Sequence, residues 1–254
     1  MSRAAQTGPA AALLALGLLL AAGPAPADSD LPVHDPWEGV NRSVFAFNEA
    51  LDRHLLEPVA RAWDFVVPDP VETALSNLFA TLRFPIVFGN DVLQAKFAAA
   101  GVDVARFLVN ATLGVAGLFD PATRLGLEAN DEDFGQTLAV LGVPEGPYFV
   151  IPLFGPSTVR DTGGLVADSA SGVYSYFAPF WVSFAARGTD ILNERSIHLE
   201  SLAEERRQAF DFYAATRNAY LQNRRARVRD EVRGAQPPQD GVDEDLYHLD
   251  EDGE

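Results

Sequence analysis

The stretch DFGQTLAVLGVPEGPYFVIPLFGPSTVRDTGG, residues 133–164, decides what kind of fold this chain can adopt. It contains ten Gly or Pro residues between two apolar clusters. Proline removes a backbone donor and fixes φ, and glycine permits positive φ, so this backbone is expected to turn repeatedly instead of forming one regular helix. The stretch is nevertheless too apolar for a solvated linker. Because unpaired backbone groups need partners, we expect it to be buried in protein or to border a cavity.

Helical patterns precede this stretch. Apolar residues recur every three to four positions from Val40 to Leu56, behind Asp35 as a candidate N-cap, and predict one long amphipathic helix. Pro58 is expected to restart the chain. Short helices are predicted over 59–65 and 71–80, followed by an apolar segment over 82–97, a helix that begins at 101, and a short helix over 134–141.

The second half is also predicted to be helical. Ser157 is a candidate N-cap for a helix over 158–170 that Gly163 and Gly164 would interrupt. Residues 169–186 carry no charge, but their serines, glycine and proline favour a buried or interfacial segment over a membrane-spanning helix. One long charged helix is predicted over 191–232. No β-alternation of useful length is visible, so the predicted fold class is all-α.

The two ends of the chain differ from its middle. A basic start, the apolar run 10–22 and a small-residue cleavage site before Asp28 are typical of a signal peptide, assigned to residues 1–27. Eight acids and no Lys or Arg follow Arg233, which predicts a disordered acidic tail over 235–254. Between the ends we expect a helical domain over 28–195 and the long charged helix over 196–234.

Composition narrows the function. With 36 Asp and Glu against 19 Lys and Arg, the net charge is −17, which argues against nucleic acid as a partner. A hydrophobic content of 48% in 254 residues can form a sizeable core. The chain has no cysteine, so an exported form would depend on its core or on a partner for stability.

The sequence offers no convincing catalytic, cofactor or metal site. The four histidines lack a metal-ligand spacing, and no nucleotide-binding motif is present. Gly155-Pro156-Ser157-Thr158-Val159 departs from G-x-S-x-G at Val159, and Ser157 is better explained as a helix cap than as a nucleophile. We therefore expect a protein that is not an enzyme; lipid hydrolysis by Ser157 is the enzymatic alternative.

Two polar pairs could instead border a pathway. Adjacent helical residues point about 100° apart, so Arg160 and Asp161 are expected to bond separate neighbours, either bracing the irregular loop or lining a pore or lipid path. Asn41 and Arg42, together with Asn48, carry the same ambiguity on the less apolar side of the first helix. The Phe-rich helices are core by default, with membrane contact as a second interpretation.

Several segments, in order, carry a family resemblance. They are Asp35-Pro36-Trp37-Glu38-Gly39-Val40-Asn41-Arg42, Phe45-x-Phe47-Asn48, Arg106-Phe107-x-x-Asn110-x-x-x-Gly114-x-x-Gly117-Leu118-Phe119-Asp120, Asp133-Phe134-Gly135-Gln136-Thr137-Leu138, and Gly146-Pro147-Tyr148 through Gly155-Pro156-Ser157 to Arg160-Asp161. With them, residues 34–195 resemble the MlaA (VacJ) family of outer-membrane lipid-transport proteins of Gram-negative bacteria.

The resemblance implies an all-α, ring-like domain on the periplasmic side of the outer membrane, with an amphipathic channel. Phospholipid misplaced in the outer leaflet would pass through it to a soluble periplasmic carrier, and trimeric porins would be partners. The candidate channel or lipid-path residues are Asn41, Arg42, Tyr148, Phe149, Ile151, Phe154, Arg160 and Asp161.

One departure from the family pattern concerns anchoring. Many family members are lipoproteins with a cysteine after the signal's apolar core, whereas here Ala22-Gly23 is followed by Pro24. Membrane residence is therefore expected to depend on the helices or on a partner. The alternative function is a porin-associated structural scaffold that binds lipid passively.

Overall fold

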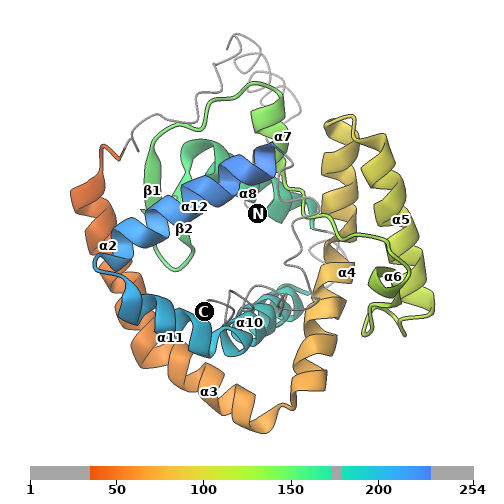
Figure 1. Ribbon diagram of the computed structural model, residues 1–254, viewed down its shortest axis with the longest axis horizontal. Coiled ribbons are helices and arrows are strands. Elements are labelled where there is room, and N and C mark those ends of the chain that lie inside the picture. Colours follow the sequence, from red (N-terminus) through yellow and green to blue (C-terminus); the bar gives the residue numbers. More distant parts are fainter. Residues whose placement is uncertain (1–34, 173–178, 230–254) are drawn as a thin grey trace, which may run out of the picture.

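The computed structural model describes residues 35–172 and 179–229, and in this part the chain forms a ring of helices (Figure 1). The predicted all-α class is confirmed. The outer wall begins with α2 (Glu38–Leu51), the π-helical segment η1 (Asp52–Leu56), α3 (Glu57–Val66) and α4 (Asp69–Leu93). The remaining elements are α5 (Phe97–Thr112), α6 (Pro121–Arg124), α7 (Phe134–Val140), β1 (Tyr148–Ile151), β2 (Gly155–Thr158), α8 (Val159–Ser171), α10 (Phe180–Ile197), α11 (Leu199–Gln208) and α12 (Phe212–Val228).

A two-stranded antiparallel hairpin corrects the expectation that no strands form. Tyr148 pairs with Thr158 and Ile151 with Gly155. Strand β1 is a four-residue apolar run without visible alternation, and β2 contains Pro156, which usually argues against a strand. A two-stranded hairpin has only edge strands, so a proline is tolerated there.

Pro58 does not restart the chain. It lies in the first turn of α3, and η1 joins that helix directly to α2. The amide of Glu57 donates to the carbonyl of Asp52, five residues back, which is the hydrogen bond of a π-helical turn. Pro58 follows in the first turn of α3, where the missing backbone N–H of a proline is tolerated. The helix begins after Trp37, so Asp35 is not the N-cap that the sequence predicted.

Two further expected interruptions are absent from the helices. Residues 71–80 and much of 82–97 lie in α4, a single 25-residue helix with Pro85 inside it. Helix α8 continues through Gly163 and Gly164, and its N-cap is Thr158, whose side chain accepts from Asp161 N, rather than Ser157. A Cβ on Gly164 would lie 2.3 Å from the backbone nitrogen of Gly135, so glycine lets α8 approach α7 closely.

The charged C-terminal segment is not one long helix. It breaks at His198 and again at residues 209–211, which separates α10, α11 and α12. The side chain of Asp211 accepts from the amide of Ala214 and caps α12. The breaks reverse the chain direction, so that α12 crosses the ring beside β2 and α7 (Figure 1).

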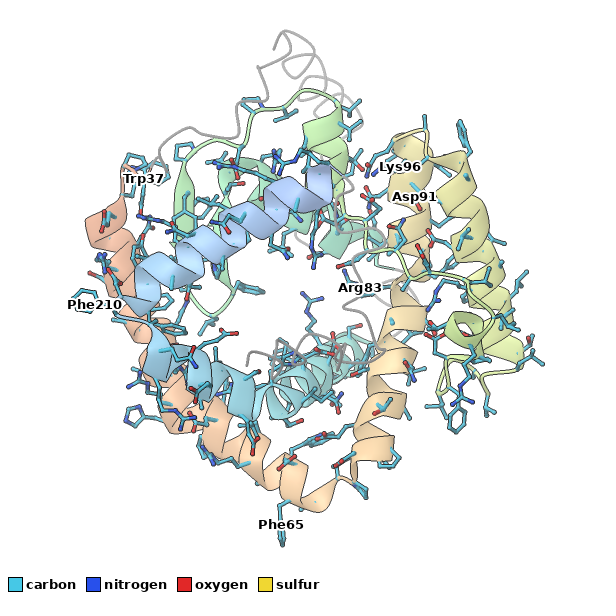
Figure 2. The ribbon with its side chains drawn as sticks, in the orientation of Figure 1. Trp37, Phe65, Arg83, Asp91, Lys96 and Phe210 are labelled. Carbon is cyan, nitrogen blue, oxygen red and sulfur yellow. The ribbon has the colours of Figure 1, made fainter. Side chains whose placement is uncertain are left out.

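The distribution of side chains between interior and surface is the reverse of that in a typical water-soluble protein. Among the described residues, ten hydrophobic side chains are buried against seventeen polar or charged ones, while 29 large hydrophobic side chains are exposed. Trp37, Phe65 and Phe210 point outward from the ring (Figure 2), and Phe65 is 89% exposed. No helix within residues 35–172 and 179–229 is long and apolar enough to cross a bilayer.

Candidate functional site

A cavity of about 680 Å³ lies between α4, the hairpin, α8, α10 and α12. It combines two kinds of lining. Its apolar residues are Leu56, Ile86, Ile151, Phe154, Leu165 and Ile191. Its polar and charged residues include Arg83, Arg187, Asp190, Glu194, Arg195 and His198. The predicted border between residues 133–164 and a cavity is thus present, because the hairpin supplies part of this wall.

Helix α10 turns one stripe toward the cavity. Positions 187, 190, 191, 194, 195 and 198 all line it, the three- and four-residue spacing of a single helix face. The opposite face is fixed by Asn193, which is 0% exposed and donates to the carbonyl of Glu72 and the hydroxyl of Ser76, both at 3.0 Å. Ser196 donates to the Glu72 carboxylate at 2.7 Å. These bonds set the rotation of α10 about its own axis.

One arginine of this stripe is held from behind. Arg195 donates twice to the carboxylate of Asp52, at 2.9 and 3.0 Å, and Arg206 of α11 donates to the same carboxylate at 2.6 Å. Burial raises the pKa of Asp52, but the bonds from Arg195 and Arg206 outweigh it and lower the pKa below its ordinary value of 3.8. The π-helical segment that begins at Asp52 therefore joins α10 and α11 to the outer wall.

Two asparagines of α2 hold the hairpin. Asn41 donates to the carbonyl of Tyr148 at 3.2 Å and accepts from the amide of Val150 at 3.1 Å. Seven residues further on, Asn48 donates to the carbonyl of Ile151 at 3.0 Å and accepts from the amide of Leu153 at 2.9 Å. Leu153 lies at the hairpin tip with a φ of 71°. The polar face of α2 thus points inward and satisfies backbone groups of the hairpin.

A buried charge cluster ties α12 to α7 and α8. Arg224 donates to Asp161 at 2.9 and 3.1 Å and to Asp133 at 3.0 Å, and Tyr220 donates to Asp161 at 2.8 Å. Burial raises the pKa of Asp161, but hydrogen bonds and charge from Arg224, together with Arg160, hold it at about 2. Asp161 is therefore ionised at neutral pH.

The expectation that Arg160 and Asp161 bond separate neighbours is wrong in part. Arg160 Nε donates to Asp161 Oδ1 at 3.1 Å, although the two are adjacent in sequence. Arg160 is the second residue of α8 and is buried, so its long side chain folds back onto the next carboxylate instead of reaching solvent. The backbone amide of Arg160 donates to the carbonyl of Glu145 in the loop at 3.4 Å, and Asp161 faces the cavity.

The structure divides the eight predicted lipid-path residues. Ile151, Phe154 and Asp161 line the cavity. Tyr148, 1% exposed, packs in the core with Tyr213 and Tyr220. The other four lie away from the lining: Asn41 is buried against the hairpin, Arg42 pairs with Glu38 and Asp211, Phe149 packs edge-to-face on Trp37, and Arg160 is bound to Asp161.

The cavity-facing charges of α10 were missed from the sequence. Arg187, Asp190 and Glu194 sit in a segment whose charges look like an ordinary solvated helix face. The pair Asn193 and Ser196 could have identified them. Short polar side chains three residues apart favour close packing of that helix face, so the charges on the other side of the helix would face away from that contact. Arg83 was missed as well; it lies on the inner side of α4 (Figure 2).

Ser157 does line the cavity, and among the described residues its hydroxyl contacts the Thr158 carbonyl and the Thr162 hydroxyl. Its hydroxyl lies 2.8 Å from that of Thr162. Burial and the charge of Asp161 raise the pKa of Tyr220 above its ordinary value, so this neighbouring phenol keeps its proton. Among the described residues no group of three or more His, Cys, Asp or Glu could hold a metal ion.

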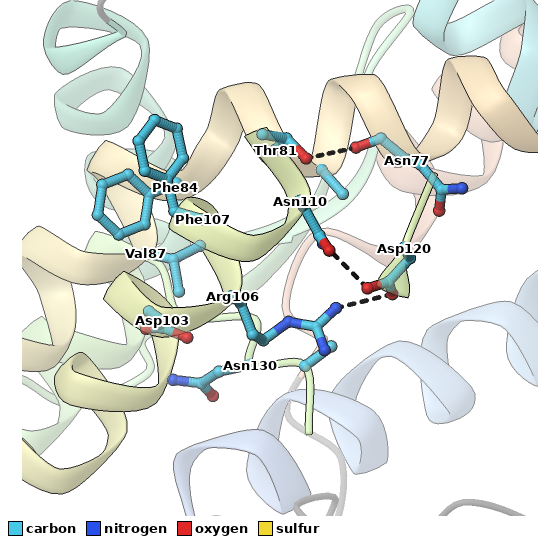
Figure 3. A pocket seen from close by; sticks show the side chains of 12 residues that line it. Asn77, Thr81, Phe84, Val87, Asp103, Arg106, Phe107, Asn110, Asp120 and Asn130 are labelled. Atoms are coloured by element: carbon cyan, nitrogen blue, oxygen red, sulfur yellow. Dashed lines mark hydrogen bonds and ion pairs between the residues drawn. The ribbon is translucent and has the colours of Figure 1, made fainter. Parts of the chain in front are cut away.

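A second, smaller cavity of about 90 Å³ lies between α4, α5 and the loop residues Asp120, Ala129 and Asn130 (Figure 3). Asp120 accepts there from Arg106 and from Asn110, at 2.8 and 2.9 Å. A Cβ on Gly114 would lie 2.3 Å from the carbonyl oxygen of Phe119. The Arg106 to Asp120 motif therefore has a structural explanation: it closes the turn after α5.

Fold and site together define a class: a helical ring with an apolar outer surface and an amphipathic central cavity. The MlaA lipoprotein family model matches residues 33–227. The chain therefore belongs to the MlaA lipoprotein family, which is a family of transport lipoproteins and not of enzymes.

Named relatives agree with this assignment. The chain is 36% identical to the intermembrane phospholipid transport system lipoprotein MlaA of Escherichia coli K12, over 82% of this chain and 84% of that protein. It is 33% identical to the protein of the same name from Haemophilus influenzae, over 78% and 80%. A solved structure from work on the structural basis for maintenance of bacterial outer membrane lipid asymmetry is similar with a TM-score of 0.69, at 34% identity, over 76% of this chain and 98% of that one.

Proposed function

We propose that this protein is the outer-membrane component of a retrograde phospholipid transport system. It takes phospholipid misplaced in the outer leaflet through the central cavity and passes it to a soluble periplasmic carrier, which maintains lipid asymmetry. No bond is made or broken. The protein resides on the periplasmic side of the outer membrane and associates there with trimeric porins.

The observation that carries this proposal is the reversed distribution of side chains. Along α2, Val40 and Phe47 are more than half exposed, whereas Asn41, about 100° further round the helix, is buried. In water such an arrangement would leave a large apolar surface exposed to solvent, which is unfavourable. In a lipid leaflet the same surface is in contact with acyl chains. The exposed apolar side chains on the outside of the ring therefore support membrane residence without a spanning helix.

The cavity suits a molecule with two chemically different parts. Its apolar residues, such as Ile86 and Leu165, can contact acyl chains, and the charged stripe of α10 can contact a headgroup. A charged or zwitterionic headgroup crossing an apolar region needs polar partners along its path. An amphipathic cavity inside an apolar ring provides them.

A paired substitution at the hairpin tip tests the proposal. Phe154→Asp places a charge in the cavity wall beside the acyl path, whereas Phe154→Leu keeps an apolar side chain there. Cells that lack the native protein and carry Phe154→Asp should accumulate outer-leaflet phospholipid, measured by labelling intact cells with an impermeant amine reagent. Cells carrying Phe154→Leu should resemble the wild type.

Porin co-purification separates transport from scaffolding. Under the proposal, Phe154→Asp impairs lipid removal and leaves the amount of co-purified porin unchanged. Equal loss of lipid removal and porin association would favour the passive scaffold instead. Unchanged outer-leaflet phospholipid with Phe154→Asp would contradict transport through this cavity.

A further inference from the structure

Two opposite charges on the cavity stripe of α10 lack partners in the structure. Arg187 and Asp190 both line the cavity. Within the described part of the chain, neither side chain makes a hydrogen bond or an ion pair, and they do not pair with each other. They lie three residues apart, about 4.5 Å along the helix axis at 1.5 Å per residue.

The other cavity-facing charges are already engaged. Arg195 is held by Asp52, Arg224 by Asp133 and Asp161, and Arg83 by Asp131 at 2.8 Å. Asp168 accepts from the amide of Phe134 at 3.0 Å, and Glu194 accepts from the hydroxyl of Ser76 at 3.2 Å. Arg187 and Asp190 are therefore the charges of this wall that a ligand can meet without breaking an existing bond.

We propose that Arg187 and Asp190 form a subsite for phospholipids whose headgroup carries both a phosphate and a primary ammonium, such as phosphatidylethanolamine. This inference rests on the proposed function and names its substrate class. Arg187 meets the phosphate, and Asp190 accepts hydrogen bonds from the ammonium. In such a headgroup a two-carbon link separates the two charged groups, a spacing comparable to the rise of about 4.5 Å between positions 187 and 190.

The environment of Asp190 favours a cationic ligand. Burial, and then the charge of Glu194, raise its pKa despite the nearby Arg187 and Arg83. A bound ammonium would supply the positive charge and the hydrogen bonds that this carboxylate lacks. Phosphatidylglycerol has the phosphate but hydroxyls in place of the ammonium, so it would satisfy Arg187 and offer Asp190 hydrogen bonds without a positive charge.

Lipid capture from a defined mixture tests the subsite. The full chain is reconstituted in vesicles of equal phosphatidylethanolamine and phosphatidylglycerol, re-extracted in detergent, and its bound phospholipid is quantified by mass spectrometry. Wild-type protein should retain more phosphatidylethanolamine, and Asp190→Asn should lower the ratio about threefold to tenfold, the effect of losing one net hydrogen bond at a partly exposed site. Arg187→Gln should reduce both lipids and change the ratio little.

Matched controls keep the outcome decisive. Asp64→Asn removes the same charge from an exposed position on α3 and should leave the ratio at the wild-type value. Asp190→Glu keeps the carboxylate and should keep the preference, which covers the case in which Asp190→Asn fails to fold. An unchanged ratio in folded Asp190→Asn, or an equal drop in Asp64→Asn, would overturn the subsite. Retention of no phospholipid by wild-type protein would instead contradict the proposed function.

Discussion

At the scale of single residues, polar side chains hold this protein together from the inside. Asn41, Asn193 and Thr158 are at most 2% exposed, and each satisfies backbone or side-chain groups of a neighbouring element. Such bonds stabilise less through their net energy than through the cost of leaving a buried partner unsatisfied. Sequence reasoning noticed Asn41 and Asn48 but could not assign their partners, which lie about a hundred residues away.

We expect a glycine-to-alanine substitution to have opposite effects on the free energy of unfolding at Gly163 and at Gly164. A Cβ at Gly164 would lie 2.3 Å from Gly135 N, so Gly164→Ala should force α7 and α8 apart and lower the free energy of unfolding by about 1–3 kcal/mol. At Gly163 the nearest atom would be a Leu138 methyl carbon at 3.9 Å, so Gly163→Ala should raise it by about 0.5–1 kcal/mol. Denaturant unfolding in detergent, followed by circular dichroism, measures both. Equal effects of the two would contradict the close helix approach.

Asp161 predicts a specific acid sensitivity. Its pKa is lowered to about 2 from an ordinary 3.8. The ionised carboxylate of Asp161 therefore stabilises the folded state fully above about pH 4, and this stabilisation is lost as the pH falls toward 2. Asp161→Asn should reduce the free energy of unfolding at neutral pH on the order of 2 kcal/mol and flatten its decline between pH 4 and 2. A variant that declines as steeply as the wild type would show that Asp161 does not carry this linkage.

At the scale of elements, the sequence predicted which segments are helical better than where they break. Continuous apolar periodicity identified α2 and α5, but Pro58 was given too much weight as a helix breaker, and α4 was predicted as two separate segments. The break before α12 was missed although Asp211, an N-cap residue, marks it. The hairpin was missed because four-residue strands show too little alternation, and its stability comes from Asn41 and Asn48 on a distant helix.

The hairpin should depend on its clamp more than on its own strand pairing. Asn41→Ala removes the acceptor for Val150 N and the donor to the Tyr148 carbonyl, so the amides of β1 should exchange with solvent faster, in line with a loss of about 1–3 kcal/mol. Ser43→Ala, on an exposed turn of the same helix, is the control and should leave exchange unchanged. Hydrogen exchange with mass spectrometry gives the comparison. Unaltered exchange in Asn41→Ala would mean that the strands are stable by themselves.

At the scale of the whole molecule, the ring places apolar side chains outside and charges within. Burial patterns from sequence assume that the apolar stripe of a helix faces a core, and α2 contradicts this because Val40 and Phe47 face outward. Fold class and family could be predicted from helical periodicity and ordered motifs. The cavity could not, because its lining comes from α4, the hairpin, α8, α10 and α12, which only the folded chain brings together.

Passage of phospholipid through the cavity is tested most directly by closing it in the assembled protein. The 254 residues contain no cysteine, so a thiol reagent would modify only an introduced one. Ile191→Cys places a thiol in the cavity wall, and Val66→Cys places one on the exposed end of α3. After treatment with a bulky maleimide, outer-leaflet phospholipid should rise in cells carrying Ile191→Cys and stay at the untreated level with Val66→Cys. Complete labelling of Ile191→Cys without any rise would contradict transport through the cavity.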